Sequence, residues 1–109
     1  MQIPDRGDIV FLDFDPQTRR EQSGRRPAIV LSPEAFNRTT GYAAVCPISR
    51  TERKWGFHVH LPDGSVVDGV VITDQLKNLD FKARNIQIKG QAPENVVEEC
   101  IKKIRTFLS

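Results

Sequence analysis

The chain has 109 residues, a formal net charge of only +2, and 39% hydrophobic residues. This length fits a single domain spanning residues 1–109, and the composition is that of a folded chain, which excludes an intrinsically disordered protein. The small net charge excludes a generally basic surface. A nucleic-acid partner would therefore have to be held by a local basic cluster.

Hydrophobic patterning predicts several short, mostly antiparallel strands and two helices. Apolar or alternating runs predict strands over residues 9–12, 28–31, 42–48, 57–61, 66–73 and 84–89. Within these, Asp68-Gly69 predicts a bend, and Gly90 is expected to end the last strand. The sum is a mainly β, α+β fold with a strongly bent sheet or partly open barrel.

The two helices are predicted from their first residues and from apolar spacing. Ser32-Pro33 predicts the start of a short helix, with Ser32 as its cap, which Gly41 ends. Pro93 opens the second helix, and apolar residues recur at helical spacing from Val97 to Leu108. This second helix is expected to cover the core.

The chain carries no apolar run near the roughly 20 residues that a membrane helix needs. Its first residues lack the pattern of a signal peptide, so we expect a cytoplasmic protein without membrane association. Cys46 and Cys100 lack CxxC spacing, and both are expected to be small buried hydrophobic residues.

Two polar segments interrupt the predicted strands. Residues 17–25 contain Arg19, Arg20 and Arg25, and residues 50–56 contain Lys54 and Trp55. An exposed Trp55 among cations could stack on an unpaired base, or the ring could fold onto the end of the barrel. The residues alone leave both interpretations open.

Arg26 and Ser49 share one property, since each marks the junction of a strand with a polar loop. If the two strands are neighbours, a guanidinium and a hydroxyl converge and can hold one phosphate. Such a pair could stabilise a pentacoordinate phosphorane by preorganised charge, without a metal. An ordinary surface ion pair of Arg26 with Glu21 is the alternative.

Other groupings of polar residues favour structural roles. His58 and His60 share one strand face and could start a metal site or form an acid–base pair, but no third ligand is near in sequence. A solvated strand face is therefore the favoured interpretation. Asp8, Asp13 and Asp15 lack the spacing of a calcium loop, so no metal is expected.

The segment Glu21–Ser32, with its Glu-Gln-x-Gly-x-Arg-Pro motif, resembles the MazF/PemK family of toxin–antitoxin endoribonucleases, and Asp74-Gln75 follows at the family's distance. The resemblance covers nearly the whole chain and is closer to the MazF branch than to PemK/Kid. It implies a small SH3-like barrel of the CcdB/MazF/Kid type, with a short helix and a C-terminal helix. It also implies a homodimer that needs no cofactor and binds an acidic MazE-like antitoxin.

The family's activity implies metal-independent, sequence-selective cleavage of single-stranded RNA, chiefly mRNA, by attack of the 2′-hydroxyl. Arg26 stands at the family's catalytic arginine, and Ser49 falls where members usually carry a threonine, with Thr51 as the other candidate hydroxyl. Glu21 matches a glutamate important for activity and is our candidate general base. Asp74 is doubtful as a base, because Ile72 replaces the arginine of the Kid branch.

Further residues are expected to contact the RNA on either side of the cleaved bond. They are Arg19, Arg20, Arg25, Thr51, Lys54, Trp55, Asp74, Gln75 and Lys77. Two other functions stay open at this point. A CcdB-like gyrase poison would share the barrel but lacks the Glu-Gln-x-Gly-x-Arg-Pro loop. A peptide-binding SH3-like module would need an aromatic-lined groove, for which the chain has one Trp and one Tyr.

Overall fold

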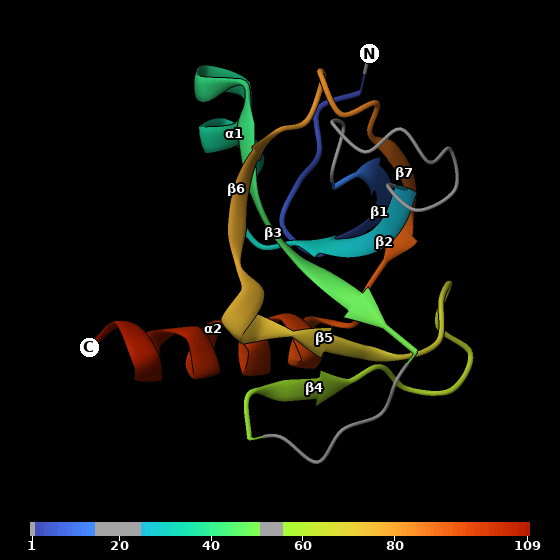
Figure 1. Ribbon diagram of the computed structural model, residues 1–109, viewed down its shortest axis with the longest axis vertical. Coiled ribbons are helices and arrows are strands. Elements are labelled where there is room, and N and C mark those ends of the chain that lie inside the picture. Colours follow the sequence, from blue (N-terminus) through green and yellow to red (C-terminus); the bar gives the residue numbers. More distant parts are fainter. Residues whose placement is uncertain (1, 15–24, 51–55) are drawn as a thin grey trace.

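The computed structural model describes residues 2–14, 25–50 and 56–109, and Figure 1 shows how their elements are arranged. In these residues seven strands form one antiparallel sheet in the order β4-β5-β3-β2-β1-β7, with β6 also paired to β3. The strands are β1 (Asp8–Asp13), β2 (Arg25–Val30), β3 (Tyr42–Ser49), β4 (His58–His60), β5 (Val70–Ile72), β6 (Lys77–Asp80) and β7 (Gln87–Gln91). The helices are α1 (Glu34–Thr40), α2 (Glu94–Leu108) and the 3₁₀ helix η1 (Thr73–Gln75).

The long strand β3 bends the sheet, because it changes neighbours along its length. Residues 42–45 pair with β6, residues 45–47 pair with β2, and Ile48 and Ser49 pair with β5. The end of β3 therefore lies where the two parts of the sheet meet (Figure 1). The mainly β, strongly bent antiparallel fold with a C-terminal helix is confirmed, although the strands of the described residues do not close into a full barrel.

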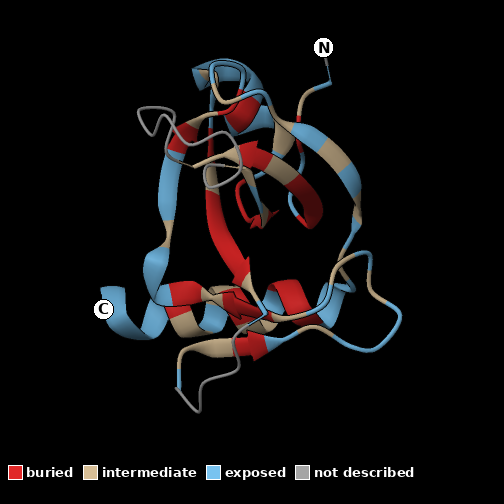
Figure 2. Cartoon of the chain, turned by 45° about the vertical axis from the view of Figure 1, so that its right-hand side comes forward, coloured by how far each residue is buried: buried red, intermediate tan, exposed pale blue. Residues whose placement is uncertain are grey.

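The core lies on both faces of the central strands, as alternation requires. Ile29 belongs to the cluster that packs with Val97 and Cys100 of α2, whereas its neighbour Val30 belongs to a second cluster with Val10 and other residues. Figure 2 shows buried residues along these strands and exposed residues on the outer side of both helices. Both cysteines are buried and free, as predicted.

One predicted strand is shorter than expected, one is shifted along the chain, and one observed strand was not predicted. The predicted strand 66–73 is reduced to β5, because Gly69 has a φ of +136° and the hydroxyl of Thr73 donates to the carbonyl of Phe57 at the start of η1. β6 was not predicted, because Leu79 is its only buried residue. β7 starts later than predicted and continues through Gly90 to Gln91.

Both predicted helices are present, but Ser32 is not a helix cap. Its hydroxyl donates to Oδ1 of Asn37 and accepts from the backbone N–H of Ala44, so it joins a buried network instead. Pro33 occupies the cap position of α1 without a side-chain hydrogen bond. Gly41 ends α1 at a φ of 77°, as expected.

The second helix, α2, begins after Pro93 as predicted. Its buried residues include Val97, Cys100 and Ile104, while Leu108 is 70% exposed. No helix in the described part of the chain is long and apolar enough to cross a membrane.

Candidate active site

Arg26 and Ser49 lie on neighbouring strands and on the same face of the sheet. The last pair in the ladder of β2 and β3 is Ala28 with Pro47, and the same register continued two residues further would bring Arg26 level with Ser49. Residues that face each other in an antiparallel pair point to the same side. Arg26 is exposed and Ser49 is half-buried, so the sheet presents both groups at one edge of the core.

Gly69 fixes the backbone beside Ser49. A Cβ atom built on Gly69 would lie 2.3 Å from the carbonyl oxygen of Ser49 and 3.3 Å from the backbone nitrogen of Arg50. The glycine also has a φ of +136°, which side chains disfavour. The sequence indicated only a bend here, because the close approach involves a strand 20 residues earlier and cannot be found from local spacing.

Arg25 has a different environment from Arg26, since neighbouring residues of a strand point to opposite faces. Its guanidinium donates to the carbonyl oxygen of Asn85 at 2.9 Å and to Oε1 of Gln87 at 2.9 Å, and it lies 3.5 Å from the carboxylate of Asp13. These contacts join the start of β2 to β1 and β7. The predicted contact of Arg25 with RNA stays a prediction.

The segment after β6 also holds the end of β1, which the sequence analysis missed. Nη1 of Arg84 donates to the carbonyl oxygens of Asp13 and Phe14, and Nδ2 of Asn85 donates to the Asp13 carboxylate at 2.9 Å. Asn85 adopts a φ of 54°, a conformation that Asn tolerates better than most residues. An Asn directly before the alternating residues 86–89 was the signal in the sequence for such a turn.

The other predicted RNA-contacting residues in the described part of the chain lie after β5. Asp74 and Gln75 are exposed on η1, which packs against β3. Lys77 is exposed on β6 opposite Val45, and its Nζ lies 6.0 Å from the centre of the Phe14 ring. The predicted sites at Glu21, Arg19, Arg20, Thr51, Lys54 and Trp55 lie outside the described residues.

A model of the PemK-like, MazF-like toxins of type II toxin–antitoxin systems matches residues 5–108. The chain belongs to this family. It is 41% identical over 95 residues to the endoribonuclease toxin MazF of Escherichia coli strain K12, which covers 86% of this chain and 85% of the relative. It is also 41% identical over 110 residues to the endoribonuclease toxin ChpB of the same strain, covering 95% and 93%.

Solved structures of the MazF family have the same fold. The crystal structure of MazF (Form-I) from Deinococcus radiodurans superposes with a TM-score of 0.90 at 40% identity, covering 99% of this chain and 98% of that one. A MazE–MazF structure (Form-II) from the same organism gives a TM-score of 0.88 at 36% identity, covering 99% and 97%. The resemblance inferred from the motif is therefore confirmed.

His58 and His60 of this family member lie on β4, at the edge of the sheet. His58 is half-buried, and its Nδ1 is buried with no hydrogen-bond partner among the described residues, whereas His60 is exposed. Within residues 2–14, 25–50 and 56–109, no group of three His, Cys, Asp or Glu residues is placed to hold a metal ion.

The two cysteines are shielded from solvent and have raised pKa values. Burial raises the pKa of the Cys100 thiol to about 12, with Glu99 adding to the effect and Lys103 opposing it. Burial also raises the pKa of Cys46, with further contributions from Cys100 and Asp74. Neutral thiols of this kind are poor nucleophiles, so we assign the cysteines to the core.

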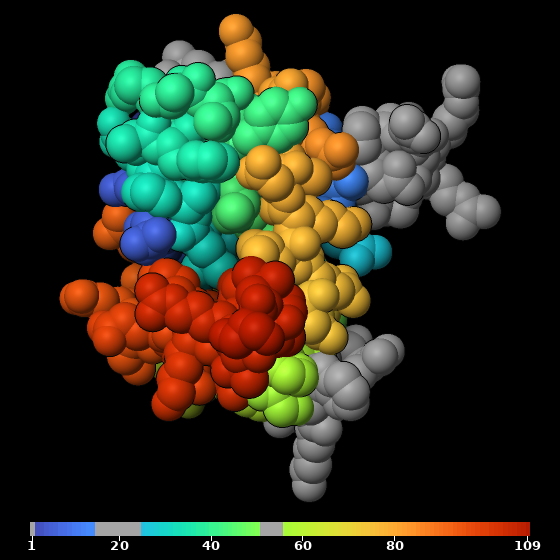
Figure 3. Space-filling view, turned by 90° about the vertical axis from the view of Figure 1, so that its left-hand side faces the viewer, coloured from blue at the N-terminus to red at the C-terminus, as the bar shows by residue number. Residues whose placement is uncertain are grey.

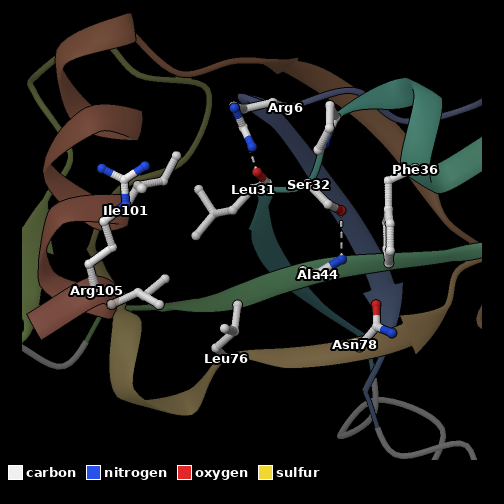
Figure 4. A pocket seen from close by; sticks show the side chains of 11 residues that line it. Arg6, Leu31, Ser32, Phe36, Ala44, Leu76, Asn78, Ile101 and Arg105 are labelled. Atoms are coloured by element: carbon white, nitrogen blue, oxygen red, sulfur yellow. Dashed lines mark hydrogen bonds between the residues drawn. The ribbon is translucent and has the colours of Figure 1, made fainter. Parts of the chain in front are cut away.

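An apolar groove of about 430 Å³ lies between α1, β3, β6 and α2. Figure 3 shows this hollow between α2, in red, and α1 above it. Its apolar lining includes Leu31, Phe36, Leu76, Ile101 and Ile104, and Arg6 and Arg105 also line it (Figure 4). Nε of Arg6 donates to the carbonyl oxygen of Leu31, which holds this arginine against the groove.

Proposed function

We propose that this endoribonuclease cuts single-stranded RNA, chiefly mRNA, at short specific sequences and without a metal ion, and thereby inhibits translation and growth. Family membership supports the nuclease activity. The chemistry is supported by the register of β2 and β3, which, continued past Ala28 and Pro47, brings Arg26 level with Ser49. A guanidinium and a hydroxyl at this spacing can hold two oxygens of the same phosphate.

In the proposed reaction the RNA supplies its own nucleophile. The 2′-oxygen forms a bond to phosphorus as the bond from phosphorus to the 5′-oxygen breaks, which leaves a 2′,3′-cyclic phosphate and a 5′-hydroxyl. Glu21 is the candidate base that takes the 2′-hydroxyl proton. The leaving 5′-oxygen takes a proton from a facing donor, for which Arg26 is the candidate.

The negative charge that develops on the phosphorane determines the roles of Arg26 and Ser49. Arg26 is protonated while the phosphorane forms, so its guanidinium stabilises this charge until it passes a proton to the leaving 5′-oxygen. Ser49 donates a hydrogen bond to a non-bridging oxygen, and Thr51 is the alternative donor. Flanking nucleotides would be held by Arg19, Arg20, Arg25, Lys54, Trp55, Asp74, Gln75 and Lys77.

RNA cleavage in EDTA tests this function directly. We expect the purified protein to cut a long RNA at a few sequences and to leave 2′,3′-cyclic phosphate and 5′-hydroxyl ends. Arg26→Ala should fold normally and cut at least about 100-fold more slowly. An intact RNA together with inhibition of DNA gyrase would instead support the CcdB-like alternative.

The antitoxin that silences this toxin is proposed to be an acidic, MazE-like protein. The neighbouring structures include MazE–MazF complexes from Deinococcus radiodurans. A peptide rich in Asp and Glu would compete with RNA for the basic residues near Arg26, in the cytoplasm where both would meet. Adding such an antitoxin should suppress cleavage, and salt should weaken the inhibition.

The toxin is proposed to act as a homodimer whose interface includes the apolar groove. β6 pairs on one side with β3 and has no second partner strand within the described residues, so its free edge lies beside the groove. A second copy could cover both the edge and the apolar lining. Sedimentation should show a dimer that Ile101→Asp dissociates, while Leu108→Asp, an exposed apolar position outside the groove lining, should leave it intact.

A further inference from the structure

His60 lies in the same cross-strand row as Ser49. Val70 of β5 pairs with Ser49 of β3 on one side and with His60 of β4 on the other. The register that brings Arg26 level with Ser49 extends this row onto β2. Because paired residues of an antiparallel sheet share a face, His60 and Ser49 point to the same side, and Arg26 would join them if the β2–β3 register continues past Ala28 and Pro47.

The opposite face of these strands is already occupied by the core. Val59, Val71 and Ile48 form the neighbouring row, and all three belong to the cluster that packs under α2. The row of His60 therefore faces away from α2; within it Val70 is buried and His60 is exposed, so the row is open to a ligand at its β4 end. Figure 1 shows β4 and β5 side by side, beyond the end of β3.

The distance from Ser49 to His60 suits a nucleotide next to the cleaved bond. Two strand spacings separate them, which is about 10 Å at roughly 4.8 Å per strand. His60 is exposed, and His58 stands on the same face of β4, two residues earlier, with a half-buried ring. Sequence-specific RNA binding commonly places unstacked bases on aromatic rings, including imidazole.

We propose that His60 stacks on the base of a nucleotide that flanks the scissile phosphate and so contributes to the choice of cleavage sequence. The proposal rests on the proposed RNA cleavage at Arg26 and Ser49. His58 lies beside this ring on the same face and limits the space available to the base. His60 touches substrate but takes no part in proton transfer, so its loss should affect KM more than kcat.

The test compares three substitutions of His60 on an RNA that contains one mapped cleavage sequence. A 2′-deoxy nucleotide at the cut position blocks the reaction and allows Kd to be measured. His60→Ala and His60→Gln should each raise Kd about tenfold, whereas His60→Phe, which keeps a ring, should stay within about twofold of wild type. Tyr42→Ala is the matched control, because it removes an exposed ring from the opposite end of β3.

The base that His60 contacts is located by placing an abasic nucleotide at each position on either side of the cut. At one position the difference between wild type and His60→Ala should disappear. Wild-type cleavage with no change in Kd or KM for His60→Ala would overturn this inference alone. The inference would also be overturned if His60→Gln bound the RNA fully while His60→Phe bound it weakly, because the contact would then be a hydrogen bond and not a stacked ring. If the wild-type protein neither cuts nor binds the RNA, the proposed function fails and the stacking role fails with it.

Discussion

Gly69 lies so close to Ser49 that the two residues constrain each other. A Cβ atom on Gly69 would stand 2.3 Å from the Ser49 carbonyl oxygen, well inside any normal contact. Backbone, not a flexible side chain, fills the space, so the strand end would have to move. The proposed hydroxyl donor thus depends on the glycine that directly precedes β5, the strand paired with the end of β3.

Gly69→Ala should displace Ser49 and slow RNA cleavage at least tenfold. The substitution should also lower the free energy of unfolding by about 1–3 kcal/mol, because an L-residue at this φ is strained. Gly64→Ala is the matched control, since Gly64 also has a positive φ, of 86°, but nothing lies within 4 Å of its Cβ position. Equal cleavage rates in the two variants would contradict the positioning role of Gly69.

Substitution of Arg25 should mainly lower the stability of the protein, whereas substitution of Arg26 should mainly lower its cleavage activity. Arg25→Ala removes hydrogen bonds to Asn85 and Gln87 and should lower the free energy of unfolding by about 1–2 kcal/mol. Arg26 is exposed, so Arg26→Ala should change stability by no more than about 0.5 kcal/mol while it abolishes most cleavage. Urea unfolding and single-turnover cleavage measure the two effects, and a large loss of stability in Arg26→Ala would argue against this division.

Substitutions at Ser49 should show whether its hydroxyl is the group that matters. Ser49→Thr keeps the hydroxyl at the residue type that the family usually carries, and we expect near wild-type cleavage. Ser49→Ala should cut about 100-fold more slowly, as when one donor to a developing oxyanion is removed. If Ser49→Ala retains full kcat while Thr51→Ala loses it, the catalytic hydroxyl is that of Thr51.

The buried cysteines should make the fold sensitive to alkaline pH. The pKa of Cys100 is raised to about 12 in the folded protein, above its ordinary value of 9.0. The folded state therefore keeps this proton while the unfolded state loses it, so the stabilisation is complete below pH 9 and declines as pH rises towards 12. The slope of unfolding free energy against pH between 9 and 11 should be shallower in Cys100→Ala. Equal slopes in the wild type and in Cys100→Ala would show that other groups cause the loss of stability at alkaline pH.

Most of the fold could be predicted from local pattern, and the failures have physical causes. β1 is a continuous apolar run and α2 has apolar residues at helical spacing, and their predicted positions are close to those observed. β6 has a single buried residue, so its pairing with β3 decides its conformation. Ser32 has the sequence of a helix cap, but its hydroxyl hydrogen-bonds instead to the side-chain amide of Asn37 and to the backbone N–H of Ala44.

The candidate site could be predicted only in part. Arg26 and Ser49 were found because each stands where an apolar strand meets a polar loop. The alignment of His60 with Ser49 passes through Val70 on a third strand, so no spacing along the chain reveals it. The different environments of Arg25 and Arg26 also became clear only when β7 was placed beside β1.

By itself the sequence determined the family, through the Glu-Gln-x-Gly-x-Arg-Pro segment, and the set of chemical groups available for cleavage. It also determined which residues of a strand share a face, because side chains alternate along any extended backbone. Only the tertiary structure decided the register between strands far apart in the chain. That register depends on how two core clusters pack around β3, and it places the Ser49 hydroxyl and the His60 imidazole in one row.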